Sequence, residues 1–307
     1  MSRTAFIFPG QGSQYCGMGR DFYEKYETAR EVYALAGKAS GLDVAALCFE
    51  EDERLHITEY TQIAMLATEV AVLKVMEQEG FRADCCAGLS LGEYGALAAA
   101  RVMELEDLFR LIRRRGIYMQ EAYPVGGAMT AVMGLSADTI REICCETPGT
   151  VSIANDNCPG QIVISGEEKA VQAAAQKLQE AGAKRCIPLK VSGPFHSPLL
   201  AGAGEKLAAE LEGVAVQDPV IPYLCNVVAL PVTDCTRVKE LLARQVSGTV
   251  RWRETMERML AEGVDTFVEI GPGKTLAGFL RRIDRDARVF NVEKTEDLEK
   301  LKTLCTG

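Results

Sequence analysis

The chain has 307 residues, of which 48% are hydrophobic and 25% are charged, and this composition is typical of a globular protein rather than a disordered one. A formal net charge of −9 argues against a nucleic-acid partner. The apolar runs are short and interrupted, so no membrane span is expected, and the N-terminus holds too few apolar residues for a signal peptide. We therefore expect a cytoplasmic protein.

The cysteines indicate neither a metal site nor a disulfide framework. There are 11 of them, an odd number, and they occur as single residues or adjacent pairs without any Cys-x-x-Cys spacing or nearby histidine. Reduced and mostly buried thiols are expected, and no metal.

The N-terminal segment predicts a buried strand at 4–8, followed by a loop rich in Gly, Gln and Ser. This loop fails as a dinucleotide-binding fingerprint, because Tyr15 stands where the third glycine belongs. It is either a plain turn or a ligand-facing loop. Helices are predicted at 21–37 and 61–79, with Thr61 as a candidate N-cap of the second.

Residues 83–101 are the most informative stretch. A short apolar run leads into the string GLSLG at 88–92, and an alanine-rich segment that favours helix follows. Strand, tight turn and helix would place Ser90 at a strained corner with its hydroxyl above a sheet. The amide of Leu91 would then face a developing oxyanion. The string also arises by chance, but the small residues that follow favour a nucleophile.

The predicted helix at 105–119 carries an arginine on its apolar face. Leu108, Ile112 and Arg115 share that face, so the Arg115 guanidinium should be buried. A buried guanidinium needs an anion, which either the protein or a ligand supplies. A snorkelling arginine or an internal salt bridge is the alternative.

A change of pattern at 126–190 predicts a small α/β unit in the order βαββαβ, which is the ferredoxin-like arrangement. A turn is expected at 155–160, and Ser165 with Glu168 fits a capping box that opens the second helix. The unit is self-contained, so it is predicted to be inserted between two halves of a larger domain.

The chain has only two histidines. His196 is predicted on a loop before the helix-starting pair Ser197-Pro198, whereas His56 lies in a charged stretch that is typical of a surface. Because a serine nucleophile needs a base, His196 is the better candidate.

The C-terminal part predicts further α/β elements. Its Gly-Lys-Thr at 273–275 fails as a phosphate loop, since Val268 stands where the first glycine belongs. The cluster Arg281, Arg282 and Arg285 is interpreted as a solvated face rather than a docking patch. The predicted strands are 223–226 and 266–270, and the predicted helices are 238–246 and 252–262 together with segments that end at 211 and 283.

Five motifs occur together in order along the whole chain: FPGQGSQ at 8–14, GLSLGEY at 88–94, RGIYMQEA at 115–122, GPFH at 193–196 and EIGPGKTL at 269–276. As a set they resemble the malonyl-CoA:acyl carrier protein transacylases of fatty-acid synthesis. The resemblance implies an α/β hydrolase-like parallel-sheet domain at 1–123 and 194–307, with a ferredoxin-like subdomain at 124–193.

The resemblance also implies roles in a two-step exchange through an acyl-serine. Ser90 matches the nucleophile and His196 its base. The amides of Gln11 and Leu91 match the oxyanion donors, and Gln245 matches the residue whose carbonyl orients the histidine, so that no acid completes a triad.

Substrate-binding residues are implied in the same way. Arg115 matches the arginine that grips the malonyl carboxylate, Gln62 a polar pocket residue, and Phe195 the bulky ring that disfavours an α-methyl branch. In two departures, Leu89 replaces a histidine common before the nucleophile and Ile63 replaces a proline common after Thr-Gln.

The implied partners are malonyl-CoA and an acidic acyl carrier protein, with coenzyme A thioester as substrate and no cofactor. The carrier is expected to dock near Arg110, Arg113 and Arg114. Alternatives are a polyketide acyltransferase, a serine hydrolase of related fold and a catalytically silent docking subunit.

Overall fold

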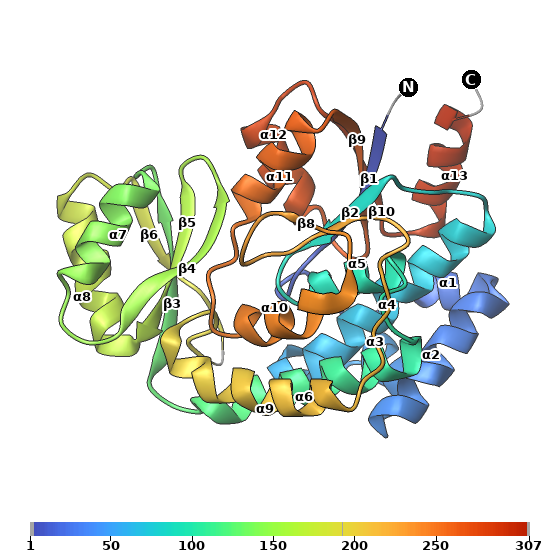
Figure 1. Cartoon of the computed structure of the whole chain (residues 1–307), viewed down its shortest axis with the longest axis horizontal. Coiled ribbons are helices and arrows are strands. Elements are labelled where there is room, and N and C mark those ends of the chain that lie inside the picture. The colour runs from blue at the N-terminus through green and yellow to red at the C-terminus, as the bar shows by residue number, and fades with distance from the viewer. Residues whose placement is uncertain (1–2, 192, 306–307) are drawn as a thin grey trace.

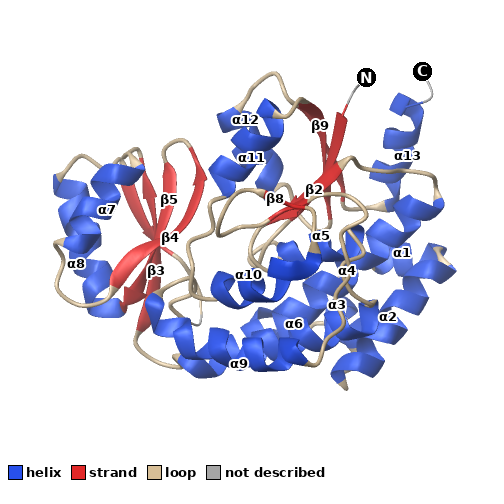
Figure 2. Ribbon diagram, viewed as in Figure 1, coloured by secondary structure: helices blue, strands red, loops and turns tan. Residues whose placement is uncertain are grey.

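A computed structural model describes residues 3–191 and 193–305, and it contains two β-sheets flanked by helices (Figures 1 and 2). The predicted α/β class is confirmed. None of the helices in the described ranges is long and apolar enough to cross a bilayer.

The larger sheet has six strands in the order β10-β9-β1-β2-β7-β8, all parallel except the terminal pair β7–β8. Its strands are β1 (Arg3–Phe8), β2 (Cys85–Gly88), β7 (Tyr223–Leu224), β8 (Pro231–Val232), β9 (Val264–Ile270) and β10 (Arg288–Val292). Successive residues of β1 face opposite cores: Phe6 and Phe8 pack against one cluster, and Ala5 and Ile7 against the other. Both faces of the sheet are therefore covered by helices, as a parallel sheet requires.

Helices α4, α5 and α6 contribute to the first of these cores, and α11 and α12 to the second, on the opposite face of the sheet (Figure 1). The α-helices around the larger sheet are α1 (Arg20–Lys25), α2 (Glu27–Ser40), α3 (Val44–Phe49), α4 (Thr58–Gln78), α5 (Gly92–Ala99), α6 (Leu105–Ala122), α9 (Ala201–Glu212), α10 (Val238–Gln245), α11 (Trp252–Ala261), α12 (Thr275–Ile283) and α13 (Thr295–Cys305). Short 3₁₀ turns are η1 (Glu53–His56), η2 (Pro198–Leu200) and η3 (Cys235–Arg237).

Two helix predictions near the N-terminus are wrong in detail. The segment 21–37 is two helices, because Tyr26 adopts an extended conformation between α1 and α2. Helix α4 begins at Thr58, and its N-cap position is Ile57. Thr61 therefore lies within the first turns, and its hydroxyl donates to the carbonyls of Leu55 and Ile57 rather than accepting from a backbone amide.

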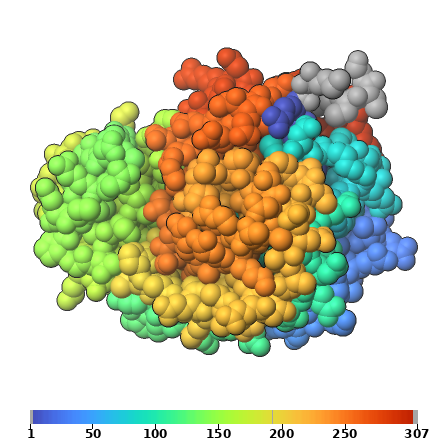
Figure 3. All heavy atoms as spheres, viewed as in Figure 1, coloured from blue at the N-terminus to red at the C-terminus, as the bar shows by residue number. Residues whose placement is uncertain are grey.

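The smaller sheet has the antiparallel order β4-β5-β3-β6, which confirms the ferredoxin-like prediction. Its elements are β3 (Gly127–Met133), α7 (Ala137–Cys145), β4 (Val151–Cys158), β5 (Gln161–Glu167), α8 (Glu168–Glu180) and β6 (Arg185–Pro188). The unit has a hydrophobic core of its own and forms a lobe beside the larger body (Figure 3). The exact domain bounds at 123/124 and 193/194 stay a prediction.

Two local predictions in this unit are wrong. Ser165 lies inside β5 rather than capping a helix, and α8 follows that strand directly with Glu167 at its N-cap position. Residues 155–158, predicted as part of a turn, belong to β4. Val250 of the larger sheet unit pairs with this strand in an isolated parallel bridge, since its amide donates to the Ala154 carbonyl at 2.8 Å and its carbonyl accepts from the Asp156 amide at 2.9 Å.

Candidate active site

Ser90 occupies a sharp corner between β2 and α5, with a backbone φ of 58°. A Cβ on Gly88 would lie 1.8 Å from the carbonyl oxygen of Gly92, and one on Gly92 would lie 2.3 Å from that of Phe8. Both flanking glycines are therefore required by close backbone approach, as the sequence predicts.

Asn226, which follows β7, pins this corner to the neighbouring strand. Its Oδ1 accepts from the Ser90 amide at 2.7 Å, and its Nδ2 donates to the Gly88 carbonyl at 2.7 Å. Asn226 was not predicted as a site residue. Its signal is a polar side chain at the carboxyl end of a short buried strand, where open α/β sheets place their sites.

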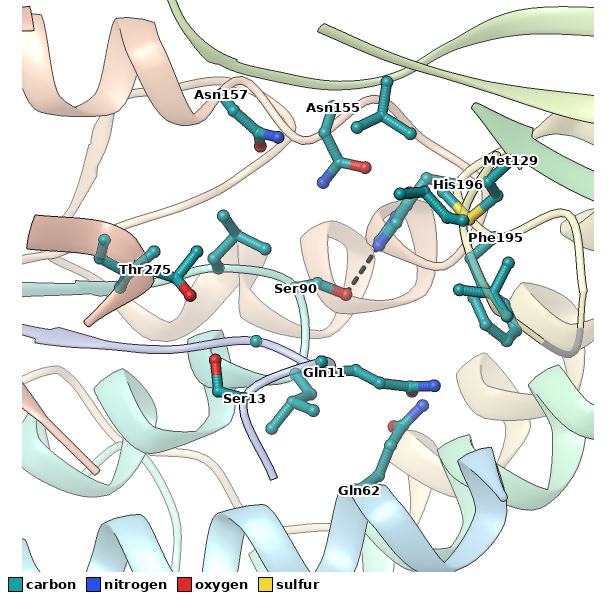
Figure 4. Close-up of a pocket in the computed structure, with 18 of the residues that line it drawn as sticks. Gln11, Ser13, Gln62, Ser90, Met129, Asn155, Asn157, Phe195, His196 and Thr275 are labelled. Carbon is teal, nitrogen blue, oxygen red and sulfur yellow. Dashed lines mark hydrogen bonds between the residues drawn. The ribbon is translucent and has the colours of Figure 1, made fainter. Parts of the chain in front are cut away.

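His196 lies beside the serine, as predicted, with its Nε2 2.7 Å from Ser90 Oγ (Figure 4). Its Nδ1 is 2.9 Å from the carbonyl oxygen of Gln245 and 3.2 Å from that of Gly248. Carbonyl oxygens only accept, so Nδ1 carries the proton and Nε2 is free to accept from the serine hydroxyl. The imidazole is thus oriented as a base without any carboxylate.

Burial of the imidazole, together with the nearby positive charge of Arg115, lowers the pKa of His196 to about 4. Its neutral, basic form is therefore maintained throughout the neutral range.

Arg115 on α6 has a buried guanidinium, with only 1% of the residue exposed. Its Nη1 donates to Gln62 Oε1 at 2.6 Å, and its Nη2 donates to Gln245 Oε1 at 2.8 Å and to Ser90 Oγ at 3.2 Å. Its Nε has no partner. Within the described ranges no carboxylate lies within 4.0 Å of it, so the internal salt bridge considered as an alternative is not present. A buried cation whose hydrogen-bond partners are all neutral creates a site for an anion next to the serine.

Gln245 links these groups. Its Nε2 donates to the Ser90 carbonyl at 2.8 Å and to Glu93 Oε2 at 2.9 Å, while its side-chain oxygen accepts from Arg115. Glu93 is completely buried, and burial raises the pKa of its carboxyl to about 7. Glu93 was not predicted as a site residue, although it stands three residues after Ser90 within the GLSLGEY motif.

Gln11, in the loop after β1, and Leu91, just before α5, line the same cavity as Ser90. Among the hydrogen bonds of residues 3–191 and 193–305, none has the backbone amide of either residue as its donor. The Gln11 side chain is held separately, since its Nε2 donates to Thr58 Oγ1 at 3.0 Å. Both backbone N–H groups are therefore available to an oxygen atom near Ser90.

A cavity of about 230 Å³ lies between the two sheet units and contains Ser90, His196, Arg115, Gln62 and Phe195 on its walls. Leu89 also lines it, so the presence of leucine where a histidine is common in the family removes a polar group from the cavity wall. Ile63 is buried in the core of α4, and Gln62 still reaches Arg115. The apolar and amide-bearing residues among the other lining residues include Met119, Met129, Val163, Leu189, Val191, Leu276, Phe279, Asn155 and Asn157.

The predicted docking arginines lie outside the cavity, and each has an acidic neighbour. Arg110 is 2.6 Å from Asp107, Arg113 is 2.9 Å from Glu59, and Arg114 is 3.7 Å from Glu210. His56 is exposed, as its charged surroundings predict. In the described part of the chain, no cluster of three His, Cys, Asp or Glu side chains could hold a metal ion.

A serine, an oriented imidazole and two available amides are the groups that acyl transfer through a covalent intermediate uses. This is the class of enzyme to which the fold and the arrangement of the cavity point. The sequence profile of the acyl transferase domain family matches residues 5–297, and the chain belongs to this family.

Three similar proteins each match 97–99% of this chain. A malonyl CoA-acyl carrier protein transacylase of Bacillus subtilis is 42% identical over 97% of this chain and 96% of its own length. The crystal structure of the Clostridium perfringens transacylase of the same name superposes with a TM-score of 0.96 at 39% identity, covering 99% of this chain and 98% of that one. A malonyl-transacylase solved in complex with a type II polyketide acyl-carrier protein superposes with a TM-score of 0.94 at 39% identity, covering 97% and 98%.

Proposed function

We propose that this protein transfers the malonyl group from malonyl-CoA to the phosphopantetheine thiol of acyl carrier protein, in fatty acid biosynthesis. The observation that carries the proposal is the buried Arg115 guanidinium, which lacks a carboxylate partner and lies 3.2 Å from Ser90 Oγ. Malonyl-CoA presents both a thioester for the serine and a carboxylate for the arginine. The relatives named above are transacylases of this type.

In the first half-reaction, Ser90 Oγ attacks the thioester carbonyl while His196 Nε2 takes the hydroxyl proton. The amides of Gln11 and Leu91 stabilise the oxyanion of the tetrahedral intermediate. When the intermediate collapses, the C–S bond breaks and the imidazolium returns its proton to the departing thiolate. Coenzyme A leaves, and a malonyl ester remains on Ser90.

The second half-reaction reverses these steps with another thiol. His196 takes the proton of the carrier's pantetheine thiol, the sulfur attacks the malonyl ester, and Ser90 regains its proton as it leaves. Arg115 holds the malonyl carboxylate through both steps, so the carbonyl stays near the serine while the thiols exchange.

Phe195 and Gln62 contribute selectivity within this proposal. Both line the cavity that holds Ser90, and Gln62 accepts a hydrogen bond from Arg115. We infer that the bulky Phe195 ring leaves little room for an α-methyl branch of the substrate. We expect methylmalonyl-CoA to react more slowly than malonyl-CoA for this reason.

The proposed chemistry needs no cofactor, since coenzyme A enters as part of the substrate. We propose a cytoplasmic location, supported by the free thiols of the cysteines in the described part of the chain. The acidic carrier is proposed to dock near Arg110, Arg113 and Arg114, even though their acidic neighbours weaken the positive potential there.

A serine hydrolase is the second candidate, because the same serine and histidine would serve water. Two observations favour transfer: backbone carbonyls rather than a carboxylate orient His196, and Arg115 faces the serine. Incubation with malonyl-CoA alone tests this. A persistent malonyl adduct on the Ser90 peptide, detected by mass spectrometry, supports transfer, whereas steady release of free malonate supports hydrolysis.

A polyketide pathway is the remaining alternative for the carrier. Comparing transfer from the malonyl enzyme to a fatty-acid carrier and to a polyketide carrier decides between them. Faster transfer to the polyketide carrier would contradict the proposed pathway while leaving the chemistry intact.

A further inference from the structure

Glu93 on α5 is a buried carboxyl group whose hydrogen-bond partners are all neutral. The residue is 0% exposed. Its Oε2 accepts from Gln245 Nε2 at 2.9 Å and from the Asn226 amide at 3.1 Å, whereas its Oε1 is buried without a hydrogen-bond partner. Two neutral donors stabilise the ionised form only in part, so this carboxyl can gain or lose a proton near neutral pH.

The side-chain amide of Gln245 connects this carboxyl to Arg115. Its Nε2 donates to Glu93, and its Oε1 accepts from Arg115 Nη2 at 2.8 Å. A guanidinium only donates and a carboxylate only accepts, so these two partners fix the direction in which the amide points. The amide dipole therefore lies between a positive and a negative group and strengthens the attraction between them.

Arg115 is the cation that faces Glu93. Burial raises the pKa of the Glu93 carboxyl to about 7, and the positive charge of Arg115 acts in the opposite direction. The other titratable groups around α5 are phenols, thiols and one further carboxyl, namely Tyr94, Tyr223, Cys225, Cys86 and Glu69. Burial raises the pKa of every one of them, which favours the neutral form of each.

A malonyl carboxylate on Arg115 changes this balance of charge. It adds a second anion to the buried network, and one guanidinium cannot neutralise two buried carboxylates. The malonyl group would contact Arg115 directly, whereas Glu93 reaches it only through an amide, so Glu93 is the group expected to become protonated. An acetyl group adds no charge and leaves Glu93 as it was.

We propose that Glu93 is a positioning residue that serves as the replaceable counter-ion of Arg115. While the site is empty, its carboxylate holds the Gln245 amide and balances the guanidinium, and when a malonyl carboxylate binds, it takes up one proton from solvent. This inference rests on the proposed function and deepens it. Because the ionised Glu93 competes with the substrate for Arg115, the preference for malonyl over acetyl should weaken as the pH rises.

The first test counts the protons taken up for each ester formed on Ser90. Wild-type protein is mixed with malonyl-CoA at pH 8 in weak buffer that contains an indicator dye. Acylation itself replaces a serine hydroxyl proton with a thiol proton, so it contributes no net change. We expect roughly 0.5–1 proton for each malonyl ester and almost none for each acetyl ester formed from acetyl-CoA.

The second test uses Glu93→Gln, which keeps an oxygen acceptor for Gln245 and removes the charge. In the wild type, the ratio of kcat/KM for malonyl-CoA to that for acetyl-CoA should fall about tenfold between pH 7 and pH 8.5. In Glu93→Gln this ratio should not change with pH, and proton uptake should disappear. Glu269→Gln is the matched control, since this buried carboxyl accepts from the Leu276 and Ala277 amides, and it should behave as the wild type does.

A purely structural role for Glu93 would lower kcat/KM for both substrates equally at every pH. That result would overturn the inference, as would malonyl ester formation without proton uptake, and both would leave the proposed function intact. If Glu93→Gln does not fold, the wild-type comparison of malonyl-CoA with acetyl-CoA decides alone. Wild-type protein that forms no malonyl ester on Ser90 would instead refute the proposed function.

Discussion

Two strand-to-helix corners of the larger sheet have the same architecture, but only one of them has a carboxylate that binds the amides at the helix N-terminus. In one, β2 turns through Ser90 into α5, and in the other, β9 turns through the segment Gly271–Lys274 into α12. Both lie at the carboxyl edge of parallel strands, where helix N-termini present unpaired amides.

We call the β9–α12 corner closed, because a carboxylate at the end of the strand accepts hydrogen bonds from the amides at the start of the helix, and the β2–α5 corner open. Glu269 at the end of β9 accepts from the amides of Leu276 at 3.0 Å and Ala277 at 2.8 Å, and also from Asn291 Nδ2 at 2.7 Å. Burial raises the pKa of this carboxyl, although the same hydrogen bonds oppose the shift. The helix N-terminus is therefore satisfied internally.

The β2–α5 corner has no such carboxylate above it. The Leu91 amide has no acceptor among the described residues, and the nearby Glu93 carboxylate accepts instead from Gln245 Nε2 and from the Asn226 amide. The corner alone therefore does not define a catalytic site in this fold. The two corners differ in whether the backbone amides at the helix N-terminus have hydrogen-bond acceptors within the protein: those of Leu276 and Ala277 do, whereas the Leu91 amide does not.

The largest effect is expected from Ser90→Ala, which should lower malonyl transfer roughly 10⁴- to 10⁶-fold, because it removes the nucleophile. The assay is carrier malonylation, with circular dichroism to check the fold. Glu269→Gln at the closed corner is the matched control and should retain most activity. Comparable losses in both variants would contradict the contrast.

Arg115→Ala should lower malonyl transfer roughly 10²- to 10³-fold, since it removes the partner of a buried carboxylate worth about 3–5 kcal/mol. Acetyl transfer should hold or rise, because acetyl carries no charge. Parallel assays with malonyl-CoA and acetyl-CoA measure the selectivity. Equal losses for both substrates would rule out the anchoring role.

Gly92→Ala should destabilise the protein by at least about 3 kcal/mol, because its Cβ would lie 2.3 Å from the Phe8 carbonyl oxygen. Gly278, the fourth residue of α12, has open space where a Cβ would lie, and Gly278→Ala should stabilise the protein by about 0.5–1 kcal/mol. Urea denaturation of both variants measures the difference. A tolerated Gly92→Ala would show that the open corner can relax.

Glu269→Ala should cost about 2–3 kcal/mol of stability, because the buried amides of Leu276 and Ala277 lose their acceptor. At a temperature where the variant is folded, kcat should stay near that of the wild type. A large fall in kcat with unchanged stability would assign the closed corner a catalytic role.

The smallest effect is expected from pH. With the pKa of His196 lowered to about 4, the base stays neutral, and kcat/KM for Ser90 acylation should show no loss from its protonation between pH 6 and 8. Glu93, with a pKa of about 7, is the buried group near the site that titrates in that window, so any inflection there should vanish in Glu93→Gln. An acid limb near pH 6.5 that persists in this variant would contradict the lowered histidine pKa.

The lowered pKa of His196 also predicts how the stability of the protein depends on pH. An unfolded histidine binds its proton near pH 6.5, whereas the folded one does so only near pH 4, so unfolding takes up a proton between these values. The contribution of His196 to stability should therefore fall as pH falls from 6.5 to 4. Glu93 shows the opposite dependence, because its pKa in the folded protein, about 7, is above its ordinary value of 4.5. The contribution of Glu93 to stability should therefore fall as the pH rises from 4.5 to 7.

Much of this architecture was predictable because it is encoded locally. The alternation of strands and helices, the glycines at 88 and 92 and the apolar face that carries Arg115 all follow from short-range pattern. The resemblance then brought Ser90, His196 and Gln245 together as an expectation, and the structure places their atoms within hydrogen-bond distance. Their catalytic roles stay predictions until the variants are measured.

What the sequence did not predict depends on distant partners. The backbone pairing beside β4 depends on Val250, and the hydrogen bond that holds the Ser90 amide depends on Asn226. Neither residue lies near its partner in sequence. Glu93 is buried by tertiary packing that no local spacing encodes. Predicting such residues requires knowing which strand ends lie next to one another at the edge of the sheet.

The bond between Val250 and β4 limits how this enzyme can be re-engineered. The small lobe is joined to the main body by this backbone pairing as well as by its covalent connections, so it is not an interchangeable module. A chimera that imports the lobe of another family member must therefore bring a compatible stretch around Thr249 and Val250. Otherwise the graft would misalign His196 relative to Ser90 even when both side chains are retained.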